Sequence, residues 1–285
     1  MLVECYDVGG TYLRQALIRD GNIESLVKRE SGKNIFNQIR YLSNESRKEY
    51  KPSAVSIALP GPVENGLLLK SPPLKIENPV NVRLELSDLS DNLYIQNDMN
   101  AAVLAEKEYG IGKKFNSFYL LTFSSGIGAG IVIDGKPLLD SSGEFGHSVL
   151  ERRPSMLLEC DCGNKGCWSA YCSGKGIKNL AKKVFDIQES TIGIFNLASS
   201  GNEDAKRVLN MVKSYNAHGL ANMVNAIETE RIVIMGSLGL SQFDRIIPRQ
   251  EEIRHYTINR VPEIVKTSLG DNIGLLGAYL LAAKS

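Results

Sequence analysis

The sequence has no apolar run long enough to cross a lipid bilayer. Its longest markedly apolar stretch, Ile273 to Ala283, has 11 residues, whereas a membrane-spanning helix needs about 20. The chain also lacks an excess of either charge, because 33 Lys and Arg face 32 Asp and Glu, for a net charge of +1. Proteins that bind nucleic acids or anionic membranes depend on clustered positive charge. We therefore expect neither a nucleic acid nor a membrane as a partner.

Two further absences concern secretion and disulfides. The N-terminal segment, Met1 to Asp7, has two acidic residues and no basic run ahead of an apolar one, so it is unlike a secretion signal. The five cysteines are odd in number, and four of them lie between Cys160 and Cys172. Short secreted scaffolds have evenly paired cysteines instead. We expect a cytoplasmic protein whose clustered cysteines bind a metal.

The length and the apolar pattern predict a two-domain α/β protein. A chain of 285 residues with 43% hydrophobic and 23% charged residues is ordinary for a globular protein of two domains. Strands come first in hairpins and then alternate with helices, which indicates α/β architecture. The predicted strands are 2–6, 12–17, 54–59, 93–95, 118–123, 130–133 and 231–235. The predicted helices are 34–49, 101–109 and 272–283, and a helical pattern dominates 176–227.

The segment from Asp7 to Thr11, which reads Asp-Val-Gly-Gly-Thr, separates the first two predicted strands. Adjacent glycines let backbone N–H groups approach an anion, because no Cβ blocks them. The Thr11 hydroxyl adds a donor, and Asp7 could hold a hydrated metal ion. This segment is therefore a candidate phosphate site, and a hairpin turn with Asp as its polar cap is the alternative.

A second glycine-rich run extends from Ser124 to Gly130, between two predicted strands. Three alternating glycines and two hydroxyls make another candidate phosphate cradle. A strand follows the run instead of a helix, so it lacks the context of a dinucleotide fingerprint, and no Gly-Lys-Ser/Thr of a Walker loop follows. The alternative is a glycine-rich bend in a sheet.

Asn97 and Asp98 follow a predicted strand and precede a predicted helix. Ligands of α/β proteins usually bind at the carboxyl ends of strands. An Asp there can accept the proton of a substrate hydroxyl as that hydroxyl attacks phosphorus. The alternative is a simple helix cap, for which Asn and Asp are favoured.

The cysteine cluster predicts a structural zinc site. His147 is followed by Cys160, Cys162 and Cys167, three thiols within eight residues of a polar, turn-rich segment. One imidazole and three thiolates form a closed tetrahedral set with no open position, which favours structure over catalysis. Cys5 and Cys172 are interpreted as ordinary small apolar residues.

Together these motifs resemble those of the ROK sugar kinases over essentially the whole chain, in the same order. The matching segments are 7–11, 58–62, 97–102, 125–130, 143–147 with 160–167, 232–237 and 272–278. The resemblance implies the two-domain, ribonuclease-H-like α/β fold of the actin and hexokinase ATPases, with an interdomain cleft. It implies a smaller domain, 1–112 plus 272–285, with the first phosphate motif and the catalytic Asp. The larger domain, 113–271, would carry the second phosphate loop, the zinc site and the adenosine-side motif.

The resemblance also implies a role for each matched residue. Asp98 would be the general base for the 6-hydroxyl of a sugar. The implied sugar-binding residues are Asn97, Gly61, Glu144, His147 and Ser169. The implied ATP-binding residues are Asp7, Gly9, Gly10, Thr11, Ser125, Gly126, Gly128 and Gly236, with Asp7 near Mg²⁺. The implied zinc ligands are His147, Cys160, Cys162 and Cys167. The expected cofactors are Mg-ATP and structural zinc, the expected partners are a sugar and ATP, and the expected assembly is a homodimer or homotetramer.

One departure from the family bears on the substrate. Ser169 stands two residues after the last zinc cysteine, where the family usually has a Glu that contacts the sugar near carbons 1 and 2. The shorter side chain leaves room for an N-acyl group on carbon 2, so we expect N-acetylmannosamine as the substrate. Glucose is the alternative substrate. A non-catalytic sugar sensor is the alternative function, although Asp98 is present.

Overall fold

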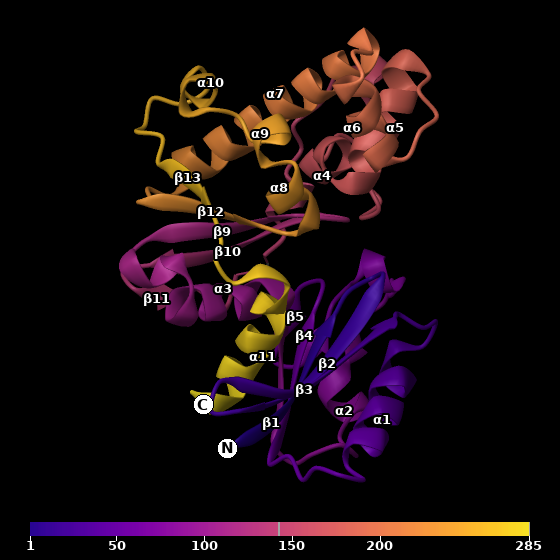
Figure 1. Ribbon diagram of the computed structural model, residues 1–285, viewed down its shortest axis with the longest axis vertical. Helices are drawn as coiled ribbons and strands as arrows, with labels where there is room; N and C mark the ends of the chain where they lie inside the picture. The colour runs from indigo at the N-terminus through magenta and orange to yellow at the C-terminus, as the bar shows by residue number, and fades with distance from the viewer. Residues whose placement is uncertain (142, 285) are drawn as a thin grey trace. The chain divides into compact units, whose positions relative to one another are not determined.

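The structure is a computed structural model that describes residues 1–141 and 143–284. The chain divides into two compact units (Figure 1). The first contains Met1–Lys114, Gly130–Gly143 and Ser268–Ser285, and the second contains Phe115–Ala129 and Glu144–Thr267.

The elements of the first unit are mostly strands with four helices among the described residues. They are β1 Leu2–Val8, β2 Tyr12–Arg19, β3 Asn22–Glu30, α1 Ile35–Ser46, β4 Ala54–Leu59, β5 Val63–Glu64, β6 Leu67–Leu68, β7 Val80–Asn81, α2 Val82–Glu85, β8 Leu93–Asn97, α3 Asp98–Tyr109, β11 Lys136–Pro137 and α11 Ile273–Ala283. Short 3-10 helices add η1 Pro72–Leu74, η2 Ile111–Lys114 and η5 Gly270–Asn272.

The second unit is richer in helices. Its elements are β9 Phe118–Phe123, η3 Phe145–His147, η4 Pro154–Met156, α4 Trp168–Cys172, α5 Gly174–Phe185, α6 Thr191–Ser199, α7 Glu203–Ala226, β12 Arg231–Met235, α8 Ser237–Ser241, α9 Phe243–Ile246, α10 Gln250–Arg254 and β13 Glu263–Lys266. One of the boundaries between the units falls inside β10, Ile127–Ile133.

The main sheet of the first unit has the order β3-β2-β1-β4-β8. β1 and β2 pair in antiparallel register, so that Asp7 faces Arg14 across the hairpin. β4 runs parallel to β1, and β8 runs parallel to β4. The carboxyl ends of β1, β4 and β8 therefore lie at one edge of the sheet, where an α/β protein usually binds its ligand.

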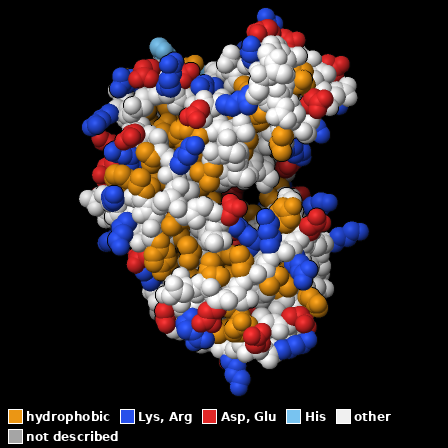
Figure 2. Space-filling view, viewed as in Figure 1, with side chains coloured by type: hydrophobic (Ala, Val, Ile, Leu, Met, Phe, Trp, Pro, Cys, Tyr) orange, Lys and Arg blue, Asp and Glu red, His pale blue; other side chains and the backbone are white. Residues whose placement is uncertain are grey.

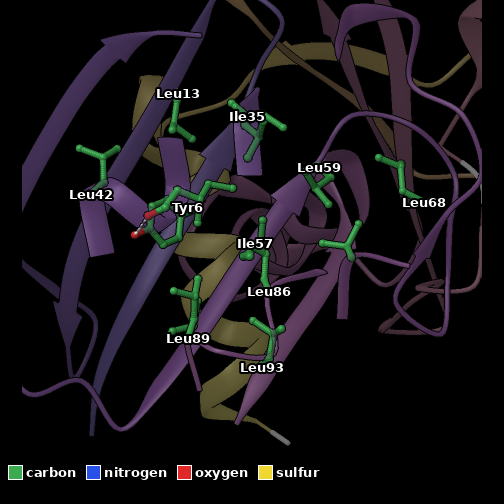
Figure 3. Close-up of a cluster of buried hydrophobic side chains, with 14 residues drawn as sticks. Tyr6, Leu13, Ile35, Leu42, Ile57, Leu59, Leu68, Leu86, Leu89 and Leu93 are labelled. Carbon is green, nitrogen blue, oxygen red and sulfur yellow. Dashed lines mark hydrogen bonds between the residues drawn. The ribbon is translucent and has the colours of Figure 1, made fainter. Parts of the chain in front are cut away.

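Helices cover both faces of this sheet. On one face, Ile35, Ile39 and Leu42 of α1 are buried at the spacing of an amphipathic helix. They pack into the hydrophobic cluster of Figure 3, in which Tyr6 of β1 and Ile57 of β4 are also drawn. On the opposite face, α11 lies against β1 and β4 and packs on α3 (Figure 1).

The contact between α11 and α3 is close enough to need a glycine. A Cβ on Gly277 would collide with the backbone carbonyl of Ala101, so only glycine fits at that point of α11. This close approach explains why a helix with such an apolar sequence is almost completely buried within the unit.

The second unit is built on β9, β12 and β13, which are parallel to one another in the sheet β11-β10-β9-β12-β13. The 24-residue helix α7 packs against α4, α5 and α6, as Figure 1 shows within this unit. Trp168 is central to that packing, because its Nε1 donates to Asn216 Oδ1 of α7 over 2.7 Å and its ring lies against Gly219.

The predicted elements are confirmed, but several short or edge strands were not predicted. All seven predicted strands and the three predicted helices are present, with ends displaced by a few residues. The strands that were not predicted are β3, β5, β6, β7, β11 and β13. The predicted larger domain, 113–271, includes residues 113–114, 130–143 and 268–271, which group with the first unit. The remaining domain bounds stay a prediction, and residue 285, at the end of the predicted segment 272–285, lies outside the described residues.

Charged side chains of both signs are interspersed over the face shown in Figure 2. This mixture agrees with the net charge of +1 in the sequence. No helix in residues 1–141 and 143–284 combines the length and the apolar character that a membrane span requires.

Candidate functional site

Three predicted site segments lie at the shared edge of the first sheet. The segment beginning at Asp7 follows β1, Gly61 follows β4, and Asn97 and Asp98 follow at the end of β8. Because these strands are parallel neighbours, the three segments are brought side by side.

The first candidate phosphate segment has an exposed tip. Gly10 and Thr11 are exposed at the end of the hairpin, and the Gly9 N–H donates to the Tyr12 carbonyl over 2.9 Å. A Cβ on Gly10 would come within 2.9 Å of Pro73, so the glycine is needed for this close approach as well as for access to an anion. The tip can present backbone N–H groups and the Thr11 hydroxyl to a ligand.

Asp7 has a counter-ion that the sequence analysis missed. The Arg14 guanidinium forms an ion pair with the Asp7 carboxylate and donates to the backbone carbonyl of Asp271. Burial raises the pKa of Asp7, and Arg14 opposes that rise. The signal was available, because Arg14 lies as far after the hairpin turn as Asp7 lies before it.

Asn97 acts as a helix cap and as a tether to Gly61. Its Oδ1 accepts from the N–H groups of Met99 and Asn100 at 2.9 and 3.1 Å, and its Nδ2 donates to the Gly61 carbonyl over 3.0 Å. This confirms the alternative interpretation of Asn97 as a cap. It also joins two predicted sugar-binding residues directly.

Asp98 is the first residue of α3 and is half-buried. Its Oδ1 accepts from the Met99 N–H over 2.8 Å. A carboxylate at the carboxyl end of a strand and at the start of a helix lies where α/β proteins usually bind their ligands. It has the chemistry of a proton acceptor.

The second candidate phosphate loop lies at the carboxyl end of β9 in the second unit. Ser125 is exposed, and the Ser124 N–H donates to the Gly126 carbonyl over 3.0 Å, which closes a tight turn. A Cβ on Gly126 would meet nothing within 4 Å, so the loop is open on that side. Gly128 follows within β10.

A pocket of about 290 Å³ adjoins this loop. Gly236 lies beside it, at the end of β12 and with a φ of 86°, and a Cβ there would collide with the Phe123 carbonyl. The pocket is lined by Ser124, Ser125, Gly174, Thr191, Ile192, Phe195, Ser237, Leu238, Ser241 and Gln242. The α6 residues among them were not predicted, because nothing in the sequence indicates that a helix so distant in the chain faces the loop.

Four predicted metal ligands converge in the second unit. The ligand atoms of His147, Cys160, Cys162 and Cys167 all lie within 4.8 Å of one another. The Cys162 and Cys167 sulfurs are 3.8 Å apart, and His147 Nδ1 is 3.4 Å from Cys160 Sγ. A tetrahedral zinc with Zn–S bonds of about 2.3 Å requires sulfurs about 3.8 Å apart. The donor set therefore fits a zinc ion.

The two nitrogens of His147 face different partners. Nδ1 faces Cys160, and Nε2 lies 3.3 Å from a carboxylate oxygen of Glu144. The contacts with Cys160 and then Glu144 raise the pKa of His147 to about 10. Burial raises the pKa of Cys160, but its hydrogen bonds with His147 and the Cys162 N–H outweigh burial and lower it to about 7. A carboxylate on the far nitrogen is the usual support of a metal-bound histidine.

The segment between these ligands is also anchored by a buried carboxylate that the sequence did not reveal. Glu151 accepts from the Tyr215 hydroxyl over 2.6 Å and from Arg153 Nη2 over 2.6 Å. The Tyr171 ring stacks on Tyr215, with ring centroids 4.5 Å apart. The loop is thus attached to α4 and α7 at a point separate from the cysteines.

Ser169 is buried in the first turn of α4, with 8% of its surface exposed. Its Oγ accepts from the Ile127 N–H over 3.0 Å, at the end of the second phosphate loop. Because the hydroxyl accepts this bond, its own hydrogen remains available for donation to another group. The structure therefore links this predicted sugar-side residue to the phosphate loop.

The predicted site residues thus form two groups, one within each unit. The first group is Asp7, Gly9, Gly10, Thr11, Gly61, Asn97 and Asp98. The second group is Ser125, Gly126, Gly128, Glu144, His147, Ser169, Gly236, Cys160, Cys162 and Cys167.

The chain is similar to known proteins over nearly its whole length. The model of the ROK family matches residues 3–285. The glucokinase of Thermotoga maritima is 28% identical in sequence over 95% of this chain and 94% of its own. The N-acetyl-D-glucosamine kinase of Aliivibrio salmonicida is 30% identical over 98% of this chain and 99% of its own.

A solved structure extends the similarity to the fold. The ROK hexokinase of Thermus thermophilus matches with a TM-score of 0.81 and 27% identity, over 100% of this chain and 98% of its own. This similarity confirms the α/β fold class that the sequence predicted.

Proposed function

Because the chain belongs to the ROK family, we propose that it is an ATP-dependent sugar kinase that phosphorylates the 6-hydroxyl of an N-acylhexosamine. The observation that carries the proposal is the position of Asp98, at the carboxyl end of β8 and beside the segments that follow β1 and β4. The named relatives, a glucokinase and an N-acetyl-D-glucosamine kinase, support the reaction class.

Asp98 would act as the general base. The 6-oxygen of the sugar attacks the γ-phosphorus of ATP, its proton passes to the Asp98 carboxylate, and ADP leaves with the electrons of the broken bond. Asn97 and Gly61 would hold the sugar beside Asp98, and the hydrogen bond between them keeps this wall of the site fixed.

The nucleotide would be held by the two glycine-rich segments. Gly9, Gly10 and Thr11 of one segment and Ser125, Gly126 and Gly128 of the other would bind phosphate oxygens. The pocket beside Ser125 and Gly236 has polar and apolar walls and is large enough for a nucleoside. Mg²⁺ that accompanies ATP would neutralise the phosphate charge, with Asp7 as the nearby carboxylate.

The cysteine cluster would hold structural zinc. With Nδ1 on the metal, His147 keeps one orientation, and its Nε2 and the Glu144 carboxylate are left together as a pair for the ring hydroxyls. The closed donor set leaves no position for a substrate on the metal. Zinc would shape the sugar-binding wall without entering the chemistry.

The choice of an N-acyl sugar rests on Ser169. Its short side chain replaces the usual Glu, and the room that it leaves would accept an N-acyl group. Within this class the sequence analysis favours N-acetylmannosamine, and the name of a 30% identical relative adds N-acetylglucosamine. Glucose is the competing substrate, since a glucokinase is 28% identical.

The test is the initial rate of ADP release from ATP with five sugars: glucose, fructose, mannose, N-acetylglucosamine and N-acetylmannosamine. We expect the highest kcat/KM with an N-acylhexosamine, and a phosphate on carbon 6 by NMR of the product. A higher kcat/KM with glucose would identify a glucokinase instead. Sugar binding without any stimulated ADP release would identify a sensor.

Replacing Ser169 with Glu tests whether the short side chain at this position leaves space for the N-acyl group of the sugar. We expect Ser169→Glu to lower kcat/KM for the N-acyl sugars relative to glucose by about tenfold, because the carboxylate fills the space for the acyl group. The measurement is the ratio of the two kcat/KM values in variant and parent. An unchanged ratio removes Ser169 from the selection of the sugar.

A further inference from the structure

One hydrogen bond joins the sugar-side part of the second unit to its phosphate loop. The Ile127 N–H donates to Ser169 Oγ over 3.0 Å, although the two residues are 42 positions apart. Both residues are buried, so water does not compete effectively for this bond. Ile127 directly follows Ser125 and Gly126, the tip of the loop.

The loop has a second attachment nearby, but that one involves backbone atoms alone. The Gly174 N–H donates to the Ser124 carbonyl over 2.8 Å, which fixes the start of the loop at the N-terminus of α5. The Ser169 hydroxyl holds the other end. Of these two attachments of the loop, only this one depends on which side chain stands at position 169.

Ser169 also lies against the segment that carries Glu144 and His147. A Cβ on Gly146 would lie 2.5 Å from Ser169 Oγ and would collide with the Ile127 carbonyl. The segment therefore packs closely against both the loop and the first turn of α4 at this point.

The backbone of Ser169 is held within α4. Ser169 lies two residues after the N-cap of this helix, Cys167, and its carbonyl accepts from the Ser173 hydroxyl over 2.6 Å. Its Oγ therefore has a fixed place from which to hold Ile127. A Glu at this position would place its acceptor oxygens two bonds farther from the backbone than Ser169 Oγ, away from the Ile127 N–H.

From this geometry we infer that Ser169 is a positioning residue for nucleotide binding: its hydroxyl sets the place of the second phosphate loop and ties it to the sugar-side segment. This inference rests on the proposed function, since it assumes that the loop binds the phosphates of ATP.

The test compares Ser169→Ala with the parent by calorimetric titration of a non-hydrolysable ATP analogue with Mg²⁺, and of the preferred sugar. We expect the Kd for the analogue to rise about three- to tenfold, as for the loss of one buried hydrogen bond. The Kd for the sugar should change less than twofold. In steady-state assays KM for ATP should rise while KM for the sugar stays the same.

Ser43→Ala is the matched control. Ser43 is also buried, and its hydroxyl donates to Glu4 over 2.9 Å in the first unit. This variant should keep both Kd values of the parent. If Ser169→Ala does not fold, Ser169→Cys replaces it, because a thiol of similar size is a weaker acceptor.

Hydrogen exchange adds a readout that does not depend on the function. Backbone amides of residues 124–130 should exchange faster in the Ser169 variant than in the parent and in the Ser43 control. Parent-like exchange together with a parent-like Kd for the analogue would overturn the inference, and so would an equal loss of nucleotide and sugar affinity. A parent that binds no nucleotide would instead overturn the proposed function.

Discussion

Asp98 lies at the first position of α3, where the N–H groups of a helix favour a negative charge. We predict that Asp98→Asn lowers kcat by at least about 100-fold, since a general base contributes roughly that much or more. Sugar affinity and fold should be kept, because Asn has the same size and is tolerated in the first turn of a helix. The measurements are kcat and the sugar Kd.

A matched control for this change is Asp204→Asn, which alters an exposed Asp in the first turn of α7. Its kcat should equal that of the parent. Turnover of the Asp98 variant within a few-fold of the parent would remove Asp98 from the mechanism.

The Glu151 carboxylate makes the free energy of unfolding depend on pH in the acid range. Hydrogen bonds from Arg153 lower its pKa from 4.5 to about 2, with help from Tyr215 and against the effect of burial. Since the folded-state pKa is the lower one, the stabilisation is complete above pH 4.5 and is lost as the pH falls toward 2.

We predict that Glu151→Gln lowers the free energy of unfolding at pH 7 by about 1–2 kcal/mol, an estimate reduced because Arg153 is exposed to solvent. The loss should shrink as the pH falls from 5 to 2, which urea unfolding at several pH values measures. Glu159→Gln, in the same loop with a side chain 83% exposed, is the control. A loss independent of pH would contradict the prediction.

At the scale of elements, the sequence predicted the strands that are buried and missed those that are not. β4 and β9 are buried along almost their whole length and appear as continuous apolar runs. β3 is an edge strand in which exposed charged residues alternate with half-buried ones, so its apolar signal is weak. β13 is short and lies at the edge of the second sheet.

The candidate site was likewise predicted only in part. Residues within one motif, such as Asp7 with the glycines after it or Cys160 with Cys162, were found from spacing alone. Glu151 was missed because its partners come from the packing of a loop, whereas spacing about the predicted hairpin could have paired Arg14 with Asp7. The pocket residues that come from α6 could be identified only from the tertiary fold.

The cysteine loop is an element whose order we expect to depend on metal. We predict about one zinc per chain by elemental analysis, and its loss in Cys162→Ser together with a lower Tm, because binding of a structural metal contributes folding free energy. Cys172→Ser is the control: this buried thiol bonds to the Val212 carbonyl and lies outside the cluster. Zinc retained at one per chain in the Cys162 variant would contradict the proposed ligand set.

At the scale of the whole molecule, the proposed ligands should stabilise the folded chain. A ligand that binds the native state alone, at 100 times its Kd, adds about 2.7 kcal/mol to the free energy of unfolding. We predict that the preferred sugar and the non-hydrolysable ATP analogue each raise Tm by about 5 °C at that concentration. Differential scanning calorimetry measures the shift. A Tm unaffected by every sugar of the panel would contradict the proposed function.

The first unit is assembled from distant parts of the chain, since α11 packs on β1 and β4 while most of the second unit lies between them in sequence. During translation β1 emerges long before α11, and at about 5–20 residues per second the interval lasts roughly ten seconds or more. For that time the face of the sheet that α11 covers is open to water. A nascent chain would therefore complete its second unit while the first still waits for its last helix.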